Sequence, residues 1–325
     1  MSWMKVEESS CLRIDGLLKH YYLSSCYAIQ FALGFPGNLL VVFGYIFCLP
    51  KWESINVYMF NLAVSDLIFL CTLPRLSYLY ANDQSESSPY LCIVNRYILH
   101  VNLYSSILFM VWVSVDRLLR VRYPSCQHFL LDRRVSLGMS VLSWALVNLQ
   151  VAPLVVLMVH DQEQGNWTSC QDFGSLRSEH SVLAYSLVLT LSGYLLPLLG
   201  LLFSSLCIAR LLRAQQGALA SSQPHSYRRP LRVVTAAALV FLVLYTPYHV
   251  MRNIRIASTE LWEEPGACTR KYVESGYILT RPLAFMHSVI NPLFYFLMGD
   301  RFRELLWAKL RGLGRRMGCD RVYGP

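Results

Sequence analysis

The stretch from residue 20 to residue 50, HYYLSSCYAIQFALGFPGNLLVVFGYIFCLP, contains no Asp, Glu, Lys or Arg. About 20 mostly apolar residues make a helix long enough to cross the roughly 30 Å hydrocarbon core of a bilayer. Further apolar stretches follow, at about residues 57–79, 93–115, 135–159, 182–209, 231–251 and 272–298. Lipid offers no hydrogen-bond partners, so each stretch must pair its own backbone groups and is expected to be a helix. The sequence therefore predicts an all-α membrane protein, a bundle of seven transmembrane helices.

The composition agrees with a membrane protein. Hydrophobic residues make up 54% of the 325-residue chain and charged residues only 15%, whereas a soluble domain carries about 25% charged residues. So few charges cannot cover a water-facing globule of this size. The same figures exclude a disordered chain and a coiled coil, because both need many charged residues.

The positive charges gather on one side of the predicted bundle. Most Lys and Arg residues lie in the connections after spans one, three and five and in the C-terminal tail. By the positive-inside rule this side faces the cytosol, so residues 1–21 are expected to be extracellular, residues 22–298 to form the bundle and residues 299–325 to be cytosolic. The net charge of +9 then reflects topology and contact with anionic membrane lipid, and no nucleic-acid partner is expected.

Two kinds of residue fit this orientation. Asn166-Trp167-Thr168 is an N-glycosylation sequon between spans four and five, on the predicted outer face. Four of the ten cysteines lie in or beside the outer segments, where disulfides can persist. These four are Cys11, Cys92, Cys170 and Cys268, and they allow three pairings.

Three arginines lie near the outer ends of different spans: Arg96, Arg252 and Arg281. A charge at the centre of a membrane helix costs roughly 2.5–3.5 kcal/mol, so such a residue should face the bundle interior and find a partner there. For any one of them, the alternative is that the side chain snorkels to the interface. Guanidinium groups are planar, bidentate donors suited to carboxylate or phosphate. Three of them without matching acids in the spans predict an anion-binding pocket.

Helical spacing adds polar residues to this pocket. Arg96, His100 and Tyr104 follow one another at intervals of four residues and line one face of span three, while His249 and Arg252 are three residues apart in span six. The alternative for each histidine is an ordinary hydrogen-bonded core histidine. The spacing therefore predicts polar groups that point inward from spans three, six and seven.

Short motifs follow one another along the spans in a fixed order. They are Gly37-Asn38, the run Asn61-Leu62-Ala63-Val64-Ser65-Asp66-Leu67, Cys92, Asp116-Arg117, Trp144, Pro197, Pro247 and the run Asn291-Pro292-Leu293-Phe294-Tyr295. With these motifs the chain resembles the rhodopsin-like (class A) G-protein-coupled receptors along nearly its whole length. The resemblance implies a plasma-membrane receptor, and not an enzyme, whose seven helices are followed by a short amphipathic cytosolic helix at 300–316.

Within that family, several stretches resemble the group of receptors for succinate, 2-oxoglutarate and purine nucleotides. They are residues 20–24, 44–47, 92–104, 246–253 and 280–285. The resemblance implies a receptor for a small dicarboxylate, with succinate as the first choice and 2-oxoglutarate, another anionic metabolite or a nucleotide as alternatives. The implied partner is a heterotrimeric G protein of the Gi class, with Gq as a second candidate.

The resemblance also implies roles for individual outer residues. Tyr27 and Tyr80 match ligand-facing tyrosines, although packing within the bundle or at the membrane interface is the alternative. Asp172 would pair with an arginine while the pocket is empty and compete with the ligand. The implied disulfides are Cys92–Cys170 and Cys11–Cys268. Arg75 departs from the family, because the basic residue of this helix usually lies further along it, and this bears on dicarboxylate selectivity.

The resemblance further implies an activation switch. Asp66 would join Asn38 and Asn291 in a polar cluster that binds sodium in the inactive state; the alternative is a purely structural network, and no other metal or cofactor is expected. Asp116 and Arg117 would form an ion pair that holds this state. Pro247 would provide the bend about which span six swings outward. The remaining switch residues are Tyr245, where the family usually has tryptophan, Pro292, and Tyr295, whose usual partner is replaced by Ser205.

Two other classes remain open at this level. Arginines within the membrane also suit a dicarboxylate transporter, but transporters usually show internal repeats and broken helix pairs, and no repeat is apparent here. A receptor-like protein that has lost signalling and acts by dimerisation is the other. Succinate uptake would indicate transport, and ligand-stimulated guanine-nucleotide exchange would indicate signalling.

Overall fold

The computed structural model describes residues 14–124, 128–164, 170, 172–175, 181–218, 224–261, 266–298, 304–309 and 311. Within these ranges every regular element is a helix. In chain order they are α2 (Ile14–Leu17), η1 (Leu18–Leu23), α3 (Ser24–Phe47), α4 (Ser54–Leu70), α5 (Leu73–Ala81), α6 (Pro89–Arg122), η2 (Phe129–Leu131), α7 (Arg133–Gln164), η3 (Phe173–Ser175), α8 (Ser181–Thr190), η4 (Leu191–Leu195), α9 (Leu196–Ala218), α10 (Pro224–Glu260), α11 (Ala267–Phe285) and α12 (His287–Met298).

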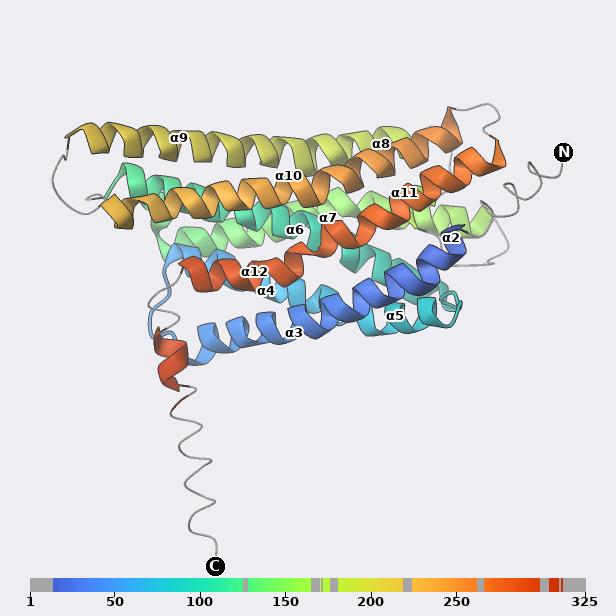
Figure 1. Cartoon of the computed structure of the whole chain (residues 1–325), viewed down its shortest axis with the longest axis horizontal. Coiled ribbons are helices and arrows are strands. Elements are labelled where there is room, and N and C mark those ends of the chain that lie inside the picture. Colours follow the sequence, from blue (N-terminus) through green and yellow to red (C-terminus); the bar gives the residue numbers. More distant parts are fainter. Residues whose placement is uncertain are drawn as a thin grey trace, which may run out of the picture.

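The long helices run side by side along the longest axis of the molecule (Figure 1). Six of the helical stretches in the described chain are long and apolar enough to cross a membrane, and α11 with α12 supplies the seventh. Helix α6 lies at the centre, since it packs against α4, α7, α9 and α10. The prediction of an all-α bundle of seven spans is confirmed.

Two of the seven spans are broken where prolines occur. Span two is divided into α4 and α5, and Pro74 stands in the first turn of α5, where a missing N–H costs little. Span seven is divided at Met286, between α11, which contains Pro282, and α12, which contains Pro292. The breaks divide each of these spans into two halves. The half at the same end of the bundle as the N-terminus of α6 is called outer and the other half inner, and the candidate site lies at the outer halves.

The exposed surface of the bundle is apolar and its interior holds the polar groups. On α7, for example, Leu149 is 73% and Val141 69% exposed, whereas the interior residues Asn38 and Asp66 are fully buried. This is the distribution expected when the surrounding solvent is lipid. The charged and amide side chains inside are therefore the first candidates for function.

A disulfide fixes the outer end of α6. Cys92 is bonded to Cys170, with their Cα atoms 5.7 Å apart, which confirms that pairing. Cys268 is also disulfide-bonded; Cys11, its expected partner, lies outside the described residues, as does the sequon residue Asn166. Residues 304–309 are helical and form a short helix set at an angle to the bundle near the end of α12 (Figure 1).

Candidate ligand-binding site

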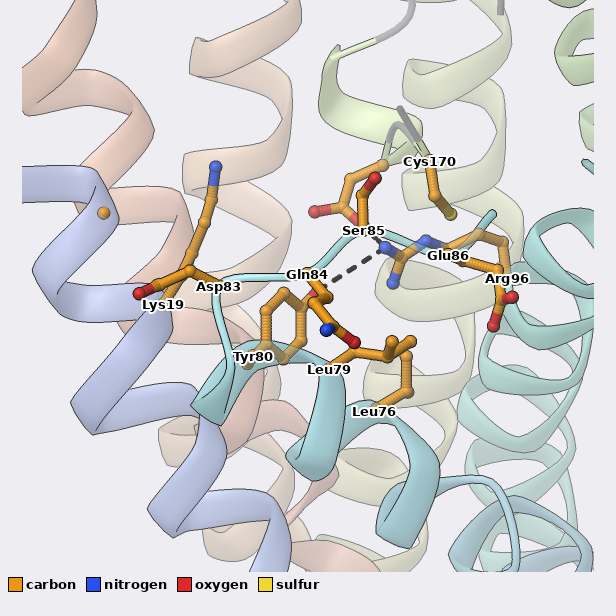
Figure 2. Close-up of a pocket in the computed structure, with 12 residues that line it drawn as sticks. Lys19, Leu76, Leu79, Tyr80, Asp83, Gln84, Ser85, Glu86, Arg96 and Cys170 are labelled. Carbon is orange, nitrogen blue, oxygen red and sulfur yellow. Dashed lines mark hydrogen bonds and ion pairs between the residues drawn. The ribbon is translucent and has the colours of Figure 1, made fainter. Parts of the chain in front are cut away.

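A cavity of about 260 Å³ lies at the outer end of the bundle, between the first helix, α5, α6 and the segment after Cys170. Its lining residues are Gly16, Lys19, Leu76, Leu79, Tyr80, Asp83, Gln84, Ser85, Glu86, Arg96, Cys170 and Asp172. Figure 2 shows that Tyr80 of α5 and Arg96 of α6 point toward each other across this space. The cavity is therefore lined by both signs of charge, with an arginine from the central helix in its wall.

Two guanidinium groups from different helices share one carboxylate beside this cavity. Arg96 Nη2 lies 2.6 Å from Asp172 Oδ1, and Arg281 Nη1 of α11 donates to Asp172 Oδ2. Arg96 is 4% and Arg281 2% exposed. Two buried cations thus balance a single anion, so the cluster has an excess positive charge.

The cluster also has hydrogen-bond donors to spare. Arg96 Nε and Nη1 and the Tyr27 hydroxyl are buried and have no partner among the described residues. Arg96 Nη2 donates to the Tyr80 hydroxyl over 3.5 Å, and the rings of Tyr27 and Tyr80 lie 6.1 Å apart. Leaving a charged donor unsatisfied in a buried place is costly. The arrangement is therefore suited to receive a further acceptor group.

Asp172 carries its negative charge in this setting. Burial raises the pKa of its carboxyl group, but the guanidinium groups of Arg281 and Arg96 outweigh burial and hold the pKa below its usual value. Asp172 is therefore ionised at neutral pH and neutralises part of the charge of the two arginines.

The third expected arginine has a separate environment. Arg252 is fully buried, and its guanidinium group donates to Tyr104 (2.7 Å), Thr190 (2.9 Å) and Ser186 (3.1 Å). It lies over the Phe173 ring at 5.2 Å, and, like Arg281 and Tyr27, it is not among the residues that line the cavity. The structure thus brings Arg96 and Arg281 together but surrounds Arg252 and Tyr104 with neutral partners between α6, α8 and α10.

The two predicted histidines differ in their surroundings. His100 Nδ1 is 2.8 Å from the carbonyl oxygen of Arg96, one turn earlier in the same helix. His100 is thus an ordinary hydrogen-bonded core histidine, which was the alternative to a role in the pocket. His249 is buried with no hydrogen-bond partner for either ring nitrogen in the described part of the chain, and its ring stacks on Tyr194 at 4.5 Å. Neither histidine lines the cavity.

A second polar cluster lies deeper in the bundle, around Asp66. Its carboxylate accepts hydrogen bonds from Asn291 (2.7 Å), Ser288 (2.8 Å), Asn102 (3.0 Å) and Ser106 (3.4 Å). Asn291 therefore joins Asp66 as expected. Asn38 joins it indirectly, because its amide donates to the Ser288 carbonyl oxygen at 2.8 Å.

At the opposite, inner end of α6, the expected ion pair between Asp116 and Arg117 is absent in the described residues, and Asp116 pairs with Arg120 instead. Arg120 Nε lies 2.8 Å from Asp116 Oδ2, and its Nη2 lies 3.0 Å from Glu53. Ser54 donates to the other oxygen of Asp116. Arg120 is one helical turn after Asp116 and faces it, whereas the adjacent Arg117 points in another direction.

The sequence matches the model of the 7 transmembrane receptor (rhodopsin family) over residues 37–295. The chain belongs to this receptor family. It is 46% identical to succinate receptor 1 of Mus musculus and 46% identical to that of Rattus norvegicus, over 92% of this chain and 93% of each relative. It is 32% identical to purinoceptor 1 of Homo sapiens, over 91% of this chain and 79% of the relative. The chain is thus a multi-pass membrane receptor for a small ligand, coupled to G proteins, and not an enzyme.

The Asp66 cluster of the receptor offers ligands for a small hard cation. Such cations bind carboxylate, hydroxyl and amide oxygens. The cluster supplies the Asp66 carboxylate, the hydroxyl groups of Ser106 and Ser288, and Asn102 Oδ1, which is buried without a partner in the described residues. These oxygens are of the kind that would hold a sodium ion.

The remaining switch residues of the receptor lie between these clusters. Tyr245 is fully buried and stacks on His287 at 5.3 Å, two residues before Pro247 within α10. Ser205 donates to the Leu201 carbonyl oxygen of its own helix at 2.9 Å, so its hydroxyl is directed along α9. Pro292 and Tyr295 belong to α12; the Tyr295 side chain lies outside the described part.

The sequence pattern missed several residues of the cavity. Lys19, Asp83 and Glu86 line it, and Glu86 is bound by Arg75, the arginine that departs from the family position. Loop residues have no helical period, so the sequence offers no sign that Glu86 turns inward. The unusual place of Arg75 is the only signal that could have pointed to a buried acid near it.

Proposed function

We propose that the receptor responds to a small extracellular dicarboxylate, with succinate as the first choice. The observation that carries this proposal is the pair of buried arginines, Arg96 and Arg281, which share the single carboxylate of Asp172. Arginine forks are the preferred partners of carboxylates in proteins. The relatives named succinate receptor 1, at 46% identity over nearly the whole chain, support the same ligand class.

In this proposal Asp172 occupies the place of a ligand carboxylate while the cavity is empty. A dicarboxylate would bring one carboxylate to Arg96 and its unpartnered N–H groups and the other to Arg281, with Tyr27 and Tyr80 donating hydrogen bonds. With Asp172 displaced from the arginines, two guanidinium groups would face two ligand carboxylates, which matches a dianion better than a monoanion. Four further residues would hold α6 and α10 in position behind the ligand site. They are Arg252, His100, Tyr104 and His249.

The ligand would act on the G protein through span six. Arg281 lies over the Tyr277 ring at 5.9 Å, and Tyr277 stacks on Tyr248 of α10 at 5.9 Å. Tyr248 is the residue after Pro247. A movement of α11 would therefore be transmitted through Tyr277 and Tyr248 to the expected bend of α10. Interfaces of this kind have two discrete packings, and a ligand that favours one of them shifts the population. The G protein would be of the Gi class, with Gq as the second candidate.

The proposal also includes the orientation of the receptor in the membrane and a bound sodium ion. The N-terminus, the cavity, the Asn166 sequon and a Cys11–Cys268 disulfide would face the outside, and the tail and its short helix would face the cytosol and its anionic lipid. A sodium ion at Asp66 would supply a fixed positive charge that stabilises the inactive packing. Nucleotides and 2-oxoglutarate remain alternative ligands, since purinoceptor 1 is also a relative, at 32% identity.

The test is G-protein activation by a panel of small dicarboxylates in cells that express the receptor. Arg96→Ala and Arg281→Ala should each lower the potency of succinate about 30-fold or more, because each leaves a ligand carboxylate unpaired. Arg270→Ala is the matched control, since Arg270 is an exposed arginine of the same helix as Arg281. Undiminished succinate responses in both variants would contradict the proposal, and uptake of labelled succinate would favour a transporter.

A further inference from the structure

The cavity wall contains an acid that the proposed ligand site does not use. We infer that Glu86 limits the charge of the ligand: its carboxylate forms an anionic part of the wall that admits a dicarboxylate and rejects anions of three or more charges, such as tricarboxylates and nucleotide polyphosphates. This inference rests on the proposed function and names the specificity of the same site.

Glu86 is held in place by a two-pronged ion pair. Arg75 Nε lies 2.6 Å from Glu86 Oε2, and Arg75 Nη2 lies 2.7 Å from Oε1. The backbone N–H of Ser88 donates to the same Oε1 at 3.4 Å. Glu86 is only 3% exposed and yet lines the cavity. The carboxylate is therefore held in place by Arg75 and by the backbone of Ser88.

Of the two residues of this ion pair, Glu86 lines the cavity and Arg75 does not. The Arg75 side chain is 52% exposed and is not part of the lining, so solvent screens its charge. The hydrogen bonds from Arg75 hold the pKa of the Glu86 carboxyl below its usual value. Glu86 thus keeps its charge at neutral pH, and the cavity senses that charge more strongly than the charge of Arg75.

The cations in the lining are already engaged. Arg96 pairs with Asp172, and the ammonium group of Lys19 lies 3.3 Å from Glu274. Two carboxylates of a ligand can occupy Arg96 and Arg281. Beyond Arg96, the described lining holds one further cation, Lys19, which already pairs with Glu274. In a cavity of about 260 Å³ a third carboxylate would lie close to Glu86. Like charges at such separations repel strongly in a partly desolvated site.

Asp83 provides the natural comparison. It also lines the cavity, but its side chain is 70% exposed and it lies 3.0 Å from His20. An acid that is exposed to water contributes little to the field in the cavity. If selectivity came from total acidity alone, Asp83 and Glu86 would be equivalent. The inference requires that they differ.

The experiment measures G-protein activation by succinate and by propane-1,2,3-tricarboxylate in the full-length receptor. Glu86→Gln should raise the potency of the tricarboxylate relative to succinate by about tenfold, whereas Asp83→Asn should change this ratio by less than about twofold. An unchanged ratio in Glu86→Gln, or an equal gain in Asp83→Asn, would overturn the inference.

Glu86→Gln leaves Arg75 without its partner, so this variant could misfold or could act only through the unpaired positive charge of Arg75. A second variant tests both explanations. The double variant Arg75→Met/Glu86→Gln has no charge at either position and must show the same gain in ratio. A gain confined to the single variant would assign the effect to the freed Arg75 and contradict the inference. A wild-type receptor that does not respond to succinate would contradict the proposed function itself, which separates the two failures.

Discussion

At the scale of single residues, Asp172 has two opposing effects. Its carboxylate neutralises two buried arginines and so stabilises the empty receptor, but it occupies donors that a ligand needs. Removing one member of a buried ion pair typically costs about 3–5 kcal/mol of stability. The same residue can therefore lower affinity and raise stability.

This gives the first prediction, for Asp172→Asn. The variant should bind succinate about tenfold more tightly, because no internal carboxylate competes for the arginines, and it should unfold at a lower temperature. Competition binding and thermal unfolding of purified receptor measure the two effects. The pKa of Asp172 lies below its usual value, so its charge persists throughout the neutral range and the gain should be the same at pH 6 and pH 8. Weaker binding by the variant would instead make Asp172 a residue that positions Arg96 and Arg281.

The second residue-scale prediction concerns Arg120. By pairing with Asp116 it leaves Arg117 without an acidic partner among the described residues. Arg120→Gln should let Asp116 pair with Arg117 and lower basal nucleotide exchange by about twofold or more, since a competing charge pair is removed. Arg122→Gln is the control, because Arg122 lies in the same last turn and its contacts among the described residues are with the neighbouring Tyr123, whose hydroxyl accepts from Nε at 3.4 Å and whose ring lies under the guanidinium group. Unchanged or raised basal exchange in Arg120→Gln would contradict this account.

How well the sequence predicts the site also depends on the residue. Arg96 and Arg281 are predictable, because a charge within an apolar span must find a partner inside the bundle. Arg252 gives the same sequence signal, yet neutral oxygens surround it, and only coordinates distinguish the two cases. Glu86 lies in a loop without periodicity and is found only when the fold brings it to Arg75.

At the scale of elements, the positions of the helices were predictable and their lengths were not. Span three was expected at 93–115 and span six at 231–251, whereas α6 runs from Pro89 to Arg122 and α10 from Pro224 to Glu260. A hydropathy pattern ends at the first charged residues, but a helix continues beyond the bilayer as long as each added residue gains a backbone hydrogen bond. Proline removes one such bond, and Pro74 and Pro282 lie near the breaks in spans two and seven. Pro36 and Pro153 lie within the unbroken helices α3 and α7, so a proline alone does not predict a break.

Close packing of η4 against α6 gives an element-scale prediction. A Cβ atom added at Gly193 would lie 2.5 Å from the Tyr104 ring, and Tyr104 in turn accepts a hydrogen bond from Arg252. Gly193→Ala should therefore destabilise the receptor by about 1–3 kcal/mol through overpacking. Gly200→Ala is the matched control one helix further on, where the nearest atom, of Val111, is 3.8 Å away. Thermal unfolding of the two variants measures the difference, and equal melting temperatures would contradict it.

At the scale of the whole molecule, two polar clusters lie at different depths along the bundle. The outer cluster of Arg96, Asp172 and Arg281 has excess positive charge, and the inner cluster around Asp66 has a carboxylate bound by neutral donors. Helix α11 carries Arg281 of the outer cluster and α12 carries Ser288 and Asn291 of the inner cluster, on either side of the break at Met286. A ligand that draws Arg281 toward α6 would move the outer half of span seven against the inner half.

The most direct test of the central claim uses purified receptor in lipid nanodiscs with a heterotrimeric G protein, and measures nucleotide exchange with succinate and with butyrate. Both have four carbons, but only succinate presents a carboxylate at each end. Succinate should stimulate exchange, butyrate should not, and Arg281→Gln should remove the difference between them. Equal stimulation by butyrate and succinate in the wild-type receptor would contradict the claim that two buried arginines recognise a dianion.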